Sequence, residues 1–173
     1  TTGSATADLG WFVLEFTDRY VQSGTVTLAD TTSSTTATIA AVDLSTSFLV
    51  FDVAVDSSNP TDGQVSGQLT NATTVTFARV GTAGAATIKW YVAEFGSGVS
   101  VQRGSAVTTA STSISVTLSP AVTLARSFPL ATLRTNGVVY SGHDFVKAKL
   151  TSTTNLDLSV TVSGGAGLPD SSW

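Results

Sequence analysis

The sequence predicts an all-β protein made of two tandem antiparallel β-sandwich repeats, immunoglobulin-like or jelly-roll-like, each of about 80 residues. Three observations support this prediction. The composition is rich in Thr, Ser and Val, and only 12% of the residues are charged, which favours strands because β-branched side chains suit a pleated sheet. Apolar and polar residues alternate with a period of two. Finally, segments of the first half recur in the second half.

The internal duplication consists of four blocks that occur twice in the same order. The first block reads W-F-V-L-E-F at 11–16 and W-Y-V-A-E-F at 90–95. The others are V-Q-S-G at 21–24 and V-Q-R-G at 101–104, then 42–48 with 122–128, and 69–77 with 150–158. A Gly-containing stretch precedes Trp11, Trp90 and Trp173, so Trp173 stands where a third copy would begin.

Alternation and turn residues predict the strands of each repeat. We expect strands at 11–16, 20–28, 36–42, 47–55, 64–70 and 73–80 in the first copy, and at 90–95, 99–108, 112–119, 127–134, 144–150 and 154–163 in the second. No helix is expected. The first repeat would span residues 1–89 and the second 90–173, with strand 90–95 available to complete the first.

The ends of this arrangement raise a question of pairing. Residues 73–80 and 87–95 are interpreted as a hairpin, and by the same logic 154–163 needs a partner that begins at Trp173. Three solutions remain open: strand 11–16 pairs with 154–163 in the same chain, a neighbouring molecule donates a strand in a head-to-tail polymer, or the chain is part of a longer array. The candidate assembly residues are Trp11, Val13, Glu15, Phe16, Leu156, Leu158, Val160 and Trp173.

Charge and composition exclude several classes of function. The net charge is −4, and the eight Lys and Arg residues stand singly, so no basic stripe is available for nucleic acid. No apolar run approaches the roughly 18 residues that a membrane-spanning helix requires. The sequence has no Cys and no Met. We therefore expect a chain that has lost an initiator Met, a signal peptide or a propeptide, or that is a piece of a longer protein.

Candidate catalytic groups are few. Glu15 and Glu94 occupy equivalent repeat positions, and two such positions do not converge on one cleft, so we interpret them as structural carboxylates rather than a glycosidase pair. His143 and Asp144 are adjacent, and neighbouring strand residues point to opposite faces. His143 is therefore interpreted as a turn residue. We expect no enzyme activity and no cofactor.

Two kinds of binding site remain as alternatives. Asp52, Asp56 and Asp62 flank an oxygen-rich loop and are weak calcium candidates, although their spacing does not fit an EF-hand and such residues also form turns. Trp11, Trp90 and Trp173 would stack on sugars if exposed, whereas Trp in an apolar strand is more often buried. An exposed aromatic residue in each repeat would favour a glycan-binding module.

The motif Trp-x-Val-x-Glu-Phe followed by Val-Gln-Arg-Gly resembles tandem repeats of phage virion proteins and bacterial surface proteins. The resemblance covers both repeats, and the first departs from it at Ser23, where the second has Arg103. It implies a β-rich extracellular, cell-surface or virion structural protein, such as a fibre, surface filament or capsid decoration protein, whose partners are further copies or other structural subunits. The alternative is a carbohydrate-binding or adhesive module.

Overall fold

A computed structural model describes residues 10, 11, 13–16, 20–107, 112–140, 142, 144–161 and 170–173. These residues form an all-β protein with antiparallel sheets, as the composition predicts. The strands are β1 (Tyr20–Leu28), β2 (Ser34–Thr38), β3 (Ser47–Val55), β4 (Ser66–Asn71), β5 (Thr74–Ala78), β6 (Ala86–Glu94), β7 (Ser105–Val107), β8 (Ser113–Thr117), β9 (Thr132–Arg134), β10 (Lys147–Ser152), β11 (Asn155–Ser159) and β12 (Asp170–Ser172). Two short helices are α1 (Pro60–Gly63) and the 3-10 helix η1 (Leu124–Arg126).

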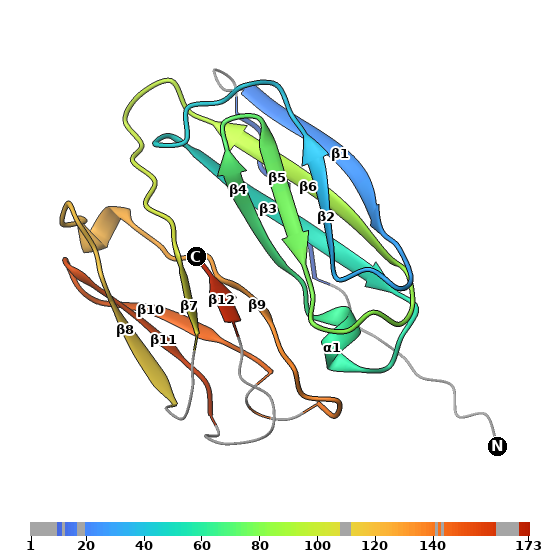
Figure 1. The fold of residues 1–173 in the computed structure, drawn as a ribbon. Coiled ribbons are helices and arrows are strands. Elements are labelled where there is room, and N and C mark those ends of the chain that lie inside the picture. The colour runs from blue at the N-terminus through green and yellow to red at the C-terminus, as the bar shows by residue number, and fades with distance from the viewer. Residues whose placement is uncertain are drawn as a thin grey trace.

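The strands form four three-stranded sheets, two in each half of the chain (Figure 1). The N-terminal half has the orders β1-β6-β3 and β2-β5-β4, and the C-terminal half has β7-β12-β9 and β8-β11-β10. Every pairing is antiparallel. The strand order of the second half is therefore that of the first. β7, β12 and β9 take the places of β1, β6 and β3, and β8, β11 and β10 take the places of β2, β5 and β4.

Alternation along β6 explains how the N-terminal core forms. Ile88, Trp90 and Val92 are buried, whereas of the residues between them Lys89 is half-buried and Tyr91 is exposed. Because successive strand side chains point to opposite faces, this strand buries one face. The buried core comprises Leu28, Ile39, Val42, Val65, Leu69, Val75, Phe77, Ala86, Ile88, Trp90 and Val92.

The core of the C-terminal half is smaller among the described residues. Its buried members are Leu118, Leu156 and Leu158, with Trp173 packed against them. Leu156 and Leu158 were candidates for an assembly edge together with Val160, which is also buried. The two leucines lie in β11, which is the central strand of its sheet, between β10 and β8.

The predicted hairpin of 73–80 with 87–95 is wrong. β5 pairs with β2 and β4, whereas β6 pairs with β1 and β3, so the chain crosses between sheets. Arg79 fixes this crossing from a fully buried position: its guanidinium donates to the carbonyl oxygens of Gly84 (2.6 Å) and Ala29 (3.0 Å), among others. A buried charge requires such partners. β11 and β12 likewise lie in different sheets, and strand 11–16 does not pair with 154–163 among the described residues.

Other differences concern strand and helix lengths. β1 and β3 have the predicted bounds, but the expected strands 99–108 and 127–134 shorten to β7 and β9. The two short helices were not expected, although α1 has Pro at its start, where a missing N–H costs nothing. No described helix is long and apolar enough to cross a membrane.

Candidate assembly site

A Gly–Trp pair recurs in both halves and explains the repeated glycine of the Val-Gln-x-Gly block. Gly24 of β1 lies opposite Trp90, and a Cβ atom on Gly24 would lie 2.4 Å from the indole Cζ2. Gly104 lies opposite Trp173 with a corresponding distance of 2.6 Å. Gly104 and Trp173 exchange both backbone hydrogen bonds, of 2.8 and 2.9 Å. Both indole rings thus cover the backbone of the neighbouring strand.

The glutamine of the same block also has the same role twice. The Gln22 amide donates to the carbonyl oxygen of Ala40 (2.9 Å) and accepts from the same residue's N–H (2.7 Å). The Gln102 amide donates to the carbonyl oxygen of Pro120 (2.8 Å) and accepts from the N–H of Ser119 (2.9 Å). Each glutamine therefore holds the chain that follows the second strand of its half.

The two halves differ beyond the tryptophan. After Trp90, β6 continues to Glu94 between β1 and β3, and the Glu94 carboxylate accepts the N–H of Asp43 (2.7 Å). The Phe95 ring then stacks on Phe48 with centroids 5.8 Å apart. After Trp173, no described strand continues between residues 100–103 and 127–130. We call this place the open strand position.

Apolar side chains beside the open strand position are exposed. Phe128 is 73% exposed and Leu124 is exposed, whereas their counterparts Phe48 and Leu44 are half-buried. Leu130 is exposed to about the same extent as its counterpart Val50. Val122 and Leu150 are half-buried, whereas their counterparts Val42 and Leu69 are buried. The incomplete sheet therefore leaves this end of the C-terminal core open to solvent.

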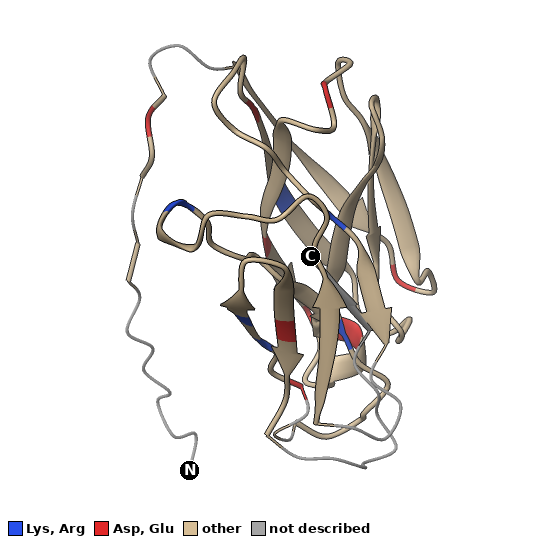
Figure 2. Cartoon of the chain, turned by 90° about the vertical axis from the view of Figure 1, so that its left-hand side faces the viewer, with Lys and Arg blue, Asp and Glu red and all other residues tan. Residues whose placement is uncertain are grey.

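The N-terminal apolar segment, residues 11 and 13–16, carries the first copy of the W-x-V-x-E-F block and lies in no sheet. Trp11 is 83% and Val13 80% exposed, and Leu14 and Glu15 are exposed as well. Its one described ring contact is edge-to-face, between Phe16 and Phe95 at 5.2 Å. Figure 2 shows the described part of this segment at the left, well clear of the sheets.

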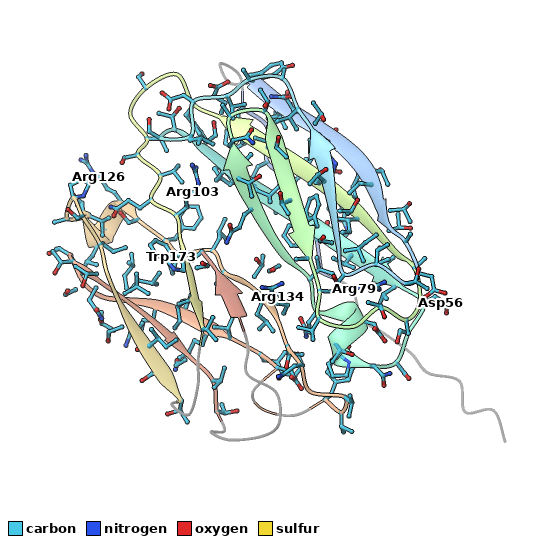
Figure 3. All side chains as sticks on the ribbon, viewed as in Figure 1. Asp56, Arg79, Arg103, Arg126, Arg134 and Trp173 are labelled. Carbon is cyan, nitrogen blue, oxygen red and sulfur yellow. The ribbon has the colours of Figure 1, made fainter. Side chains whose placement is uncertain are left out.

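The junction between the halves is fixed by Arg103, which stands at the position of Ser23 in the first copy. Its guanidinium donates to the carbonyl oxygens of Leu44 and of Ser47, the latter at 2.7 Å, and the Val101 N–H donates to Ser45 (2.7 Å). Figure 3 shows Arg103 between the two halves. Burial lowers the Arg103 pKa, and the Asp43 carboxylate opposes that shift.

Asp43 belongs to the same turn that Arg103 contacts. Its carboxylate accepts the hydroxyl (2.7 Å) and the N–H (2.8 Å) of Ser45. These hydrogen bonds lower the Asp43 pKa, with a small further contribution from Arg103. The turn therefore presents its carbonyl oxygens to Arg103 in a fixed geometry.

The calcium candidates do not form a site. Asp52 and Asp56 are exposed, whereas Asp62 is buried, and its carboxylate accepts the Ser57 hydroxyl (2.7 Å) and the Ala83 N–H (3.0 Å). Among the described residues, no three His, Cys, Asp or Glu side chains gather where they could hold a metal ion. His143 lies outside the described residues.

A half-open cavity of about 240 Å³ lies between the two halves. Its lining is rich in hydroxyl groups: Ser66, Gln68, Thr70, Thr76, Ala78, Ser105 and Arg134. Nearby, the Gly67 N–H donates to the Thr132 hydroxyl (3.2 Å), which joins β4 to β9. The described lining contains no carboxylate or imidazole.

Comparisons with protein-family models, with curated proteins and with solved structures found no match. The resemblance to virion and surface repeats stays a prediction.

The sequence had pointed to Trp11, Val13, Glu15, Phe16 and Trp173, and the structure places the first four on an exposed segment and the fifth beside the open strand position. Sequence reasoning missed Gln102, Phe128 and Leu130, which border that position. The repeat offset was the signal that could have found them, because it maps these three onto Gln22, Phe48 and Val50, the neighbours of β6.

Proposed function

We propose that this chain is a non-enzymatic structural protein of an extracellular, cell-surface or virion assembly, such as a filament, fibre or capsid decoration. In this proposal, each half is one copy of a tandem β-sandwich unit. Copies assemble through strand and apolar contacts. The observation that carries the proposal is the exposed N-terminal apolar segment, with Trp11 and Val13 at least 80% exposed.

Exposure of this kind favours assembly for a physical reason. Burying a side chain of this size is worth about 1.5–3 kcal/mol, and large exposed apolar surfaces on soluble proteins mark sites of association. The segment repeats the sequence pattern of residues 90–95, most of which form the end of β6. A partner that supplies strand edges would satisfy both the backbone and the side chains.

The remaining surface offers little chemistry that would favour an enzyme. Charged residues are sparse and scattered over the described chain (Figure 2). With no Cys and no Met, the chain has few readily oxidised groups, which suits a protein exposed to the environment.

The glycan-binding alternative requires an exposed aromatic side chain in each half. Of the three repeated tryptophans only Trp11 is strongly exposed, because Trp90 is 6% exposed and Trp173 packs against the C-terminal core. The C-terminal half has an exposed pair, Tyr140 and Phe145, whose rings stack at 6.3 Å. The N-terminal half also has exposed aromatic side chains, Tyr20 and Tyr91, but it has Pro60 and Val65 at the places of the stacked pair. Because the stacked pair is not repeated, we favour the structural role.

The mass distribution of the 173-residue chain, measured by mass photometry and negative-stain microscopy over a range of concentrations, tests the proposal. We expect regular assemblies that grow with concentration, because association follows mass action. A sample that stays at 17.6 kDa at every concentration would contradict a self-assembling structural role.

A further inference from the structure

We propose that residues 13–16 of a second copy of this chain enter the open strand position and form the missing part of the central strand. Copies would then join head to tail by a donated strand. This inference rests on the proposed function and names its partner. The starting point is the N-terminal half, where residues 92–95 of the same sequence pattern follow Trp90 at the equivalent place.

The first side of the open position has the hydrogen-bonding geometry that a strand requires. Gly104 and Trp173 exchange both backbone bonds, and in an antiparallel pair alternate residues face the same neighbour. The N–H and C=O groups of Gln102 and Ser100 therefore face the open position. Val101, between them, faces away, and its N–H donates to Ser45 in the N-terminal half (2.7 Å). Among the described residues, the backbone groups of Gln102 and Ser100 have no hydrogen-bond partner.

The second side has matching geometry. In the N-terminal half, Phe48 and Val50 pair with Ala93 and Tyr91 of β6. By the same alternation, the backbone groups of their counterparts Phe128 and Leu130 face the open position. The residue between them is Pro129, which has no N–H, and it faces away from the entering strand. A proline is compatible with an edge strand when it stands on the side that makes no ladder bond.

The side chains of the donated strand match the places they would fill. Val13 corresponds to Val92, which is fully buried in the first half, and would cover Val122 and Leu150. Phe16 corresponds to Phe95 and would stack on Phe128, as Phe95 stacks on Phe48. Glu15 corresponds to Glu94, whose carboxylate accepts the Asp43 N–H. In the donated strand, Glu15 would accept the N–H of Thr123.

The connectivity selects a second copy over the same chain. In the observed junction, β6 completes the N-terminal half and then leads, through residues 96–99, into the half that follows it. Residues 11–16 lead in the same way into β1 of their own N-terminal half. The half that they complete therefore precedes their own N-terminal half, and in an assembly of 173-residue chains that half is the C-terminal half of the preceding copy. Such a contact joins unlike surfaces and continues as an open chain.

Site-specific cross-linking tests the register directly. Val21 and Ala93 are paired in the N-terminal half, and the equivalent intermolecular pair is Val101 with Leu14. This is a pair without direct hydrogen bonds, with Cα atoms about 4.5 Å apart, which a disulfide can span. The chain has no natural Cys, so Leu14→Cys and Val101→Cys introduce the only thiols.

We expect an oxidised equimolar mixture of full-length L14C and V101C chains to give a heterodimer on a non-reducing gel, and the double variant to give a ladder. The matched control replaces V101C by V107C, an exposed valine in β7 that is opposite Asp170. An equal yield with V107C, or no heterodimer with V101C, would overturn the proposal. A double variant that forms only a cross-linked monomer would show that the strand enters its own chain.

A second variant separates failure of this inference from failure of the proposed function. Val13→Asp places a charge where a fully buried side chain is expected, so the assembled fraction should fall about tenfold or more. Val138→Asp, at an exposed position outside the open strand position, should leave it unchanged. If V13D assembles as the unmodified chain does, the donated strand is wrong and the structural role stands. If the unmodified chain does not assemble, the proposed function fails first.

Discussion

The central strand of the N-terminal half, β6, runs for nine residues between β1 and β3, whereas its counterpart β12 runs for three between β7 and β9. Three features around the two strands are shared: the sheet order, the Gly–Trp pair and the glutamine that binds the chain after the second strand. The burial is not shared, because Val42 and Leu69 are buried and their counterparts Val122 and Leu150 are not. The two halves thus share a sheet order, whereas the described residues of the C-terminal half bury fewer apolar side chains.

The comparison also separates two kinds of core residue. Arg79 and Val160 hold the same place at the end of the fifth strand of each half: their N–H groups donate to Ser33 and Thr112 respectively. In the first half the buried guanidinium satisfies backbone carbonyls, and in the second an aliphatic side chain fills the space. The N-terminal half therefore depends on a polar network that the C-terminal half does without.

The largest expected effect follows from this difference. Arg79→Ala should lower the free energy of unfolding by about 3 kcal/mol or more, because several buried carbonyl oxygens lose their donor. Val160→Ala should cost about 2 kcal/mol, the usual order for a truncated core side chain. Urea unfolding gives both values, and hydrogen exchange shows which half loses protection. A smaller loss of unfolding free energy for Arg79→Ala than for Val160→Ala would contradict the view that the N-terminal half depends on its polar network.

A smaller effect is expected at the two glycines. Gly24→Ala should destabilise the chain by about 2 kcal/mol, because the new Cβ meets the ring of the buried Trp90. Gly104→Ala should cost about half as much, since Trp173 is only partly buried and its ring can shift. Thermal unfolding of the two variants checks the order. Equal losses would show that Trp173 is held as firmly as Trp90.

The smallest expected effect on stability concerns the junction. Arg103→Ser makes it like the first copy, which has Ser23, and should change the free energy of unfolding by no more than about 1 kcal/mol because the guanidinium is half exposed. Protease cleavage within residues 96–99 should accelerate, since the Leu44 and Ser47 contacts are lost. Arg126→Ala, at an exposed position in η1, is the control. An unchanged cleavage rate in Arg103→Ser would show that Arg103 does not stabilise the junction between the two halves.

Much of the fold could be predicted because the residues within a segment largely decide whether that segment forms a strand. The alternation at 20–28 and 47–55 fixed both ends of β1 and β3, whereas strand partners depend on residues far away in the sequence. The hairpin prediction failed because it assumed that strands adjacent in the sequence pair with each other. Instead, the chain crosses to the other sheet after β5, where the buried Arg79 side chain binds backbone carbonyl oxygens. The N-terminal apolar segment shows the same dependence on distant residues. Its sequence pattern matches that of 90–95, yet residues 11 and 13–16 lie in no sheet, whereas β6 pairs with both β1 and β3.

The candidate site could be predicted in part for a related reason. Val13, Glu15 and Phe16 stood out as strand residues that lacked a partner, whereas Phe128 and Leu130 belonged to the expected strand 127–134. Phe128 is 73% exposed although its counterpart Phe48 is half-buried, and alternation along one strand does not reveal this difference because burial depends on what packs beside the strand. The buried contacts of Asp62 with Ser57 and Ala83 likewise depend on the geometry of the turn, which the composition of the loop did not predict.

The difference between Ser23 and Arg103 has a mechanical consequence for a head-to-tail polymer. Inside a chain, the Arg103 guanidinium binds the preceding turn, whereas a joint between chains of such a polymer would have the hydroxymethyl side chain of Ser23 at that place. Such a polymer would alternate stiff and compliant joints along its length. Under tension it would bend and yield first at every second joint, between molecules, while the two halves of each molecule stayed together.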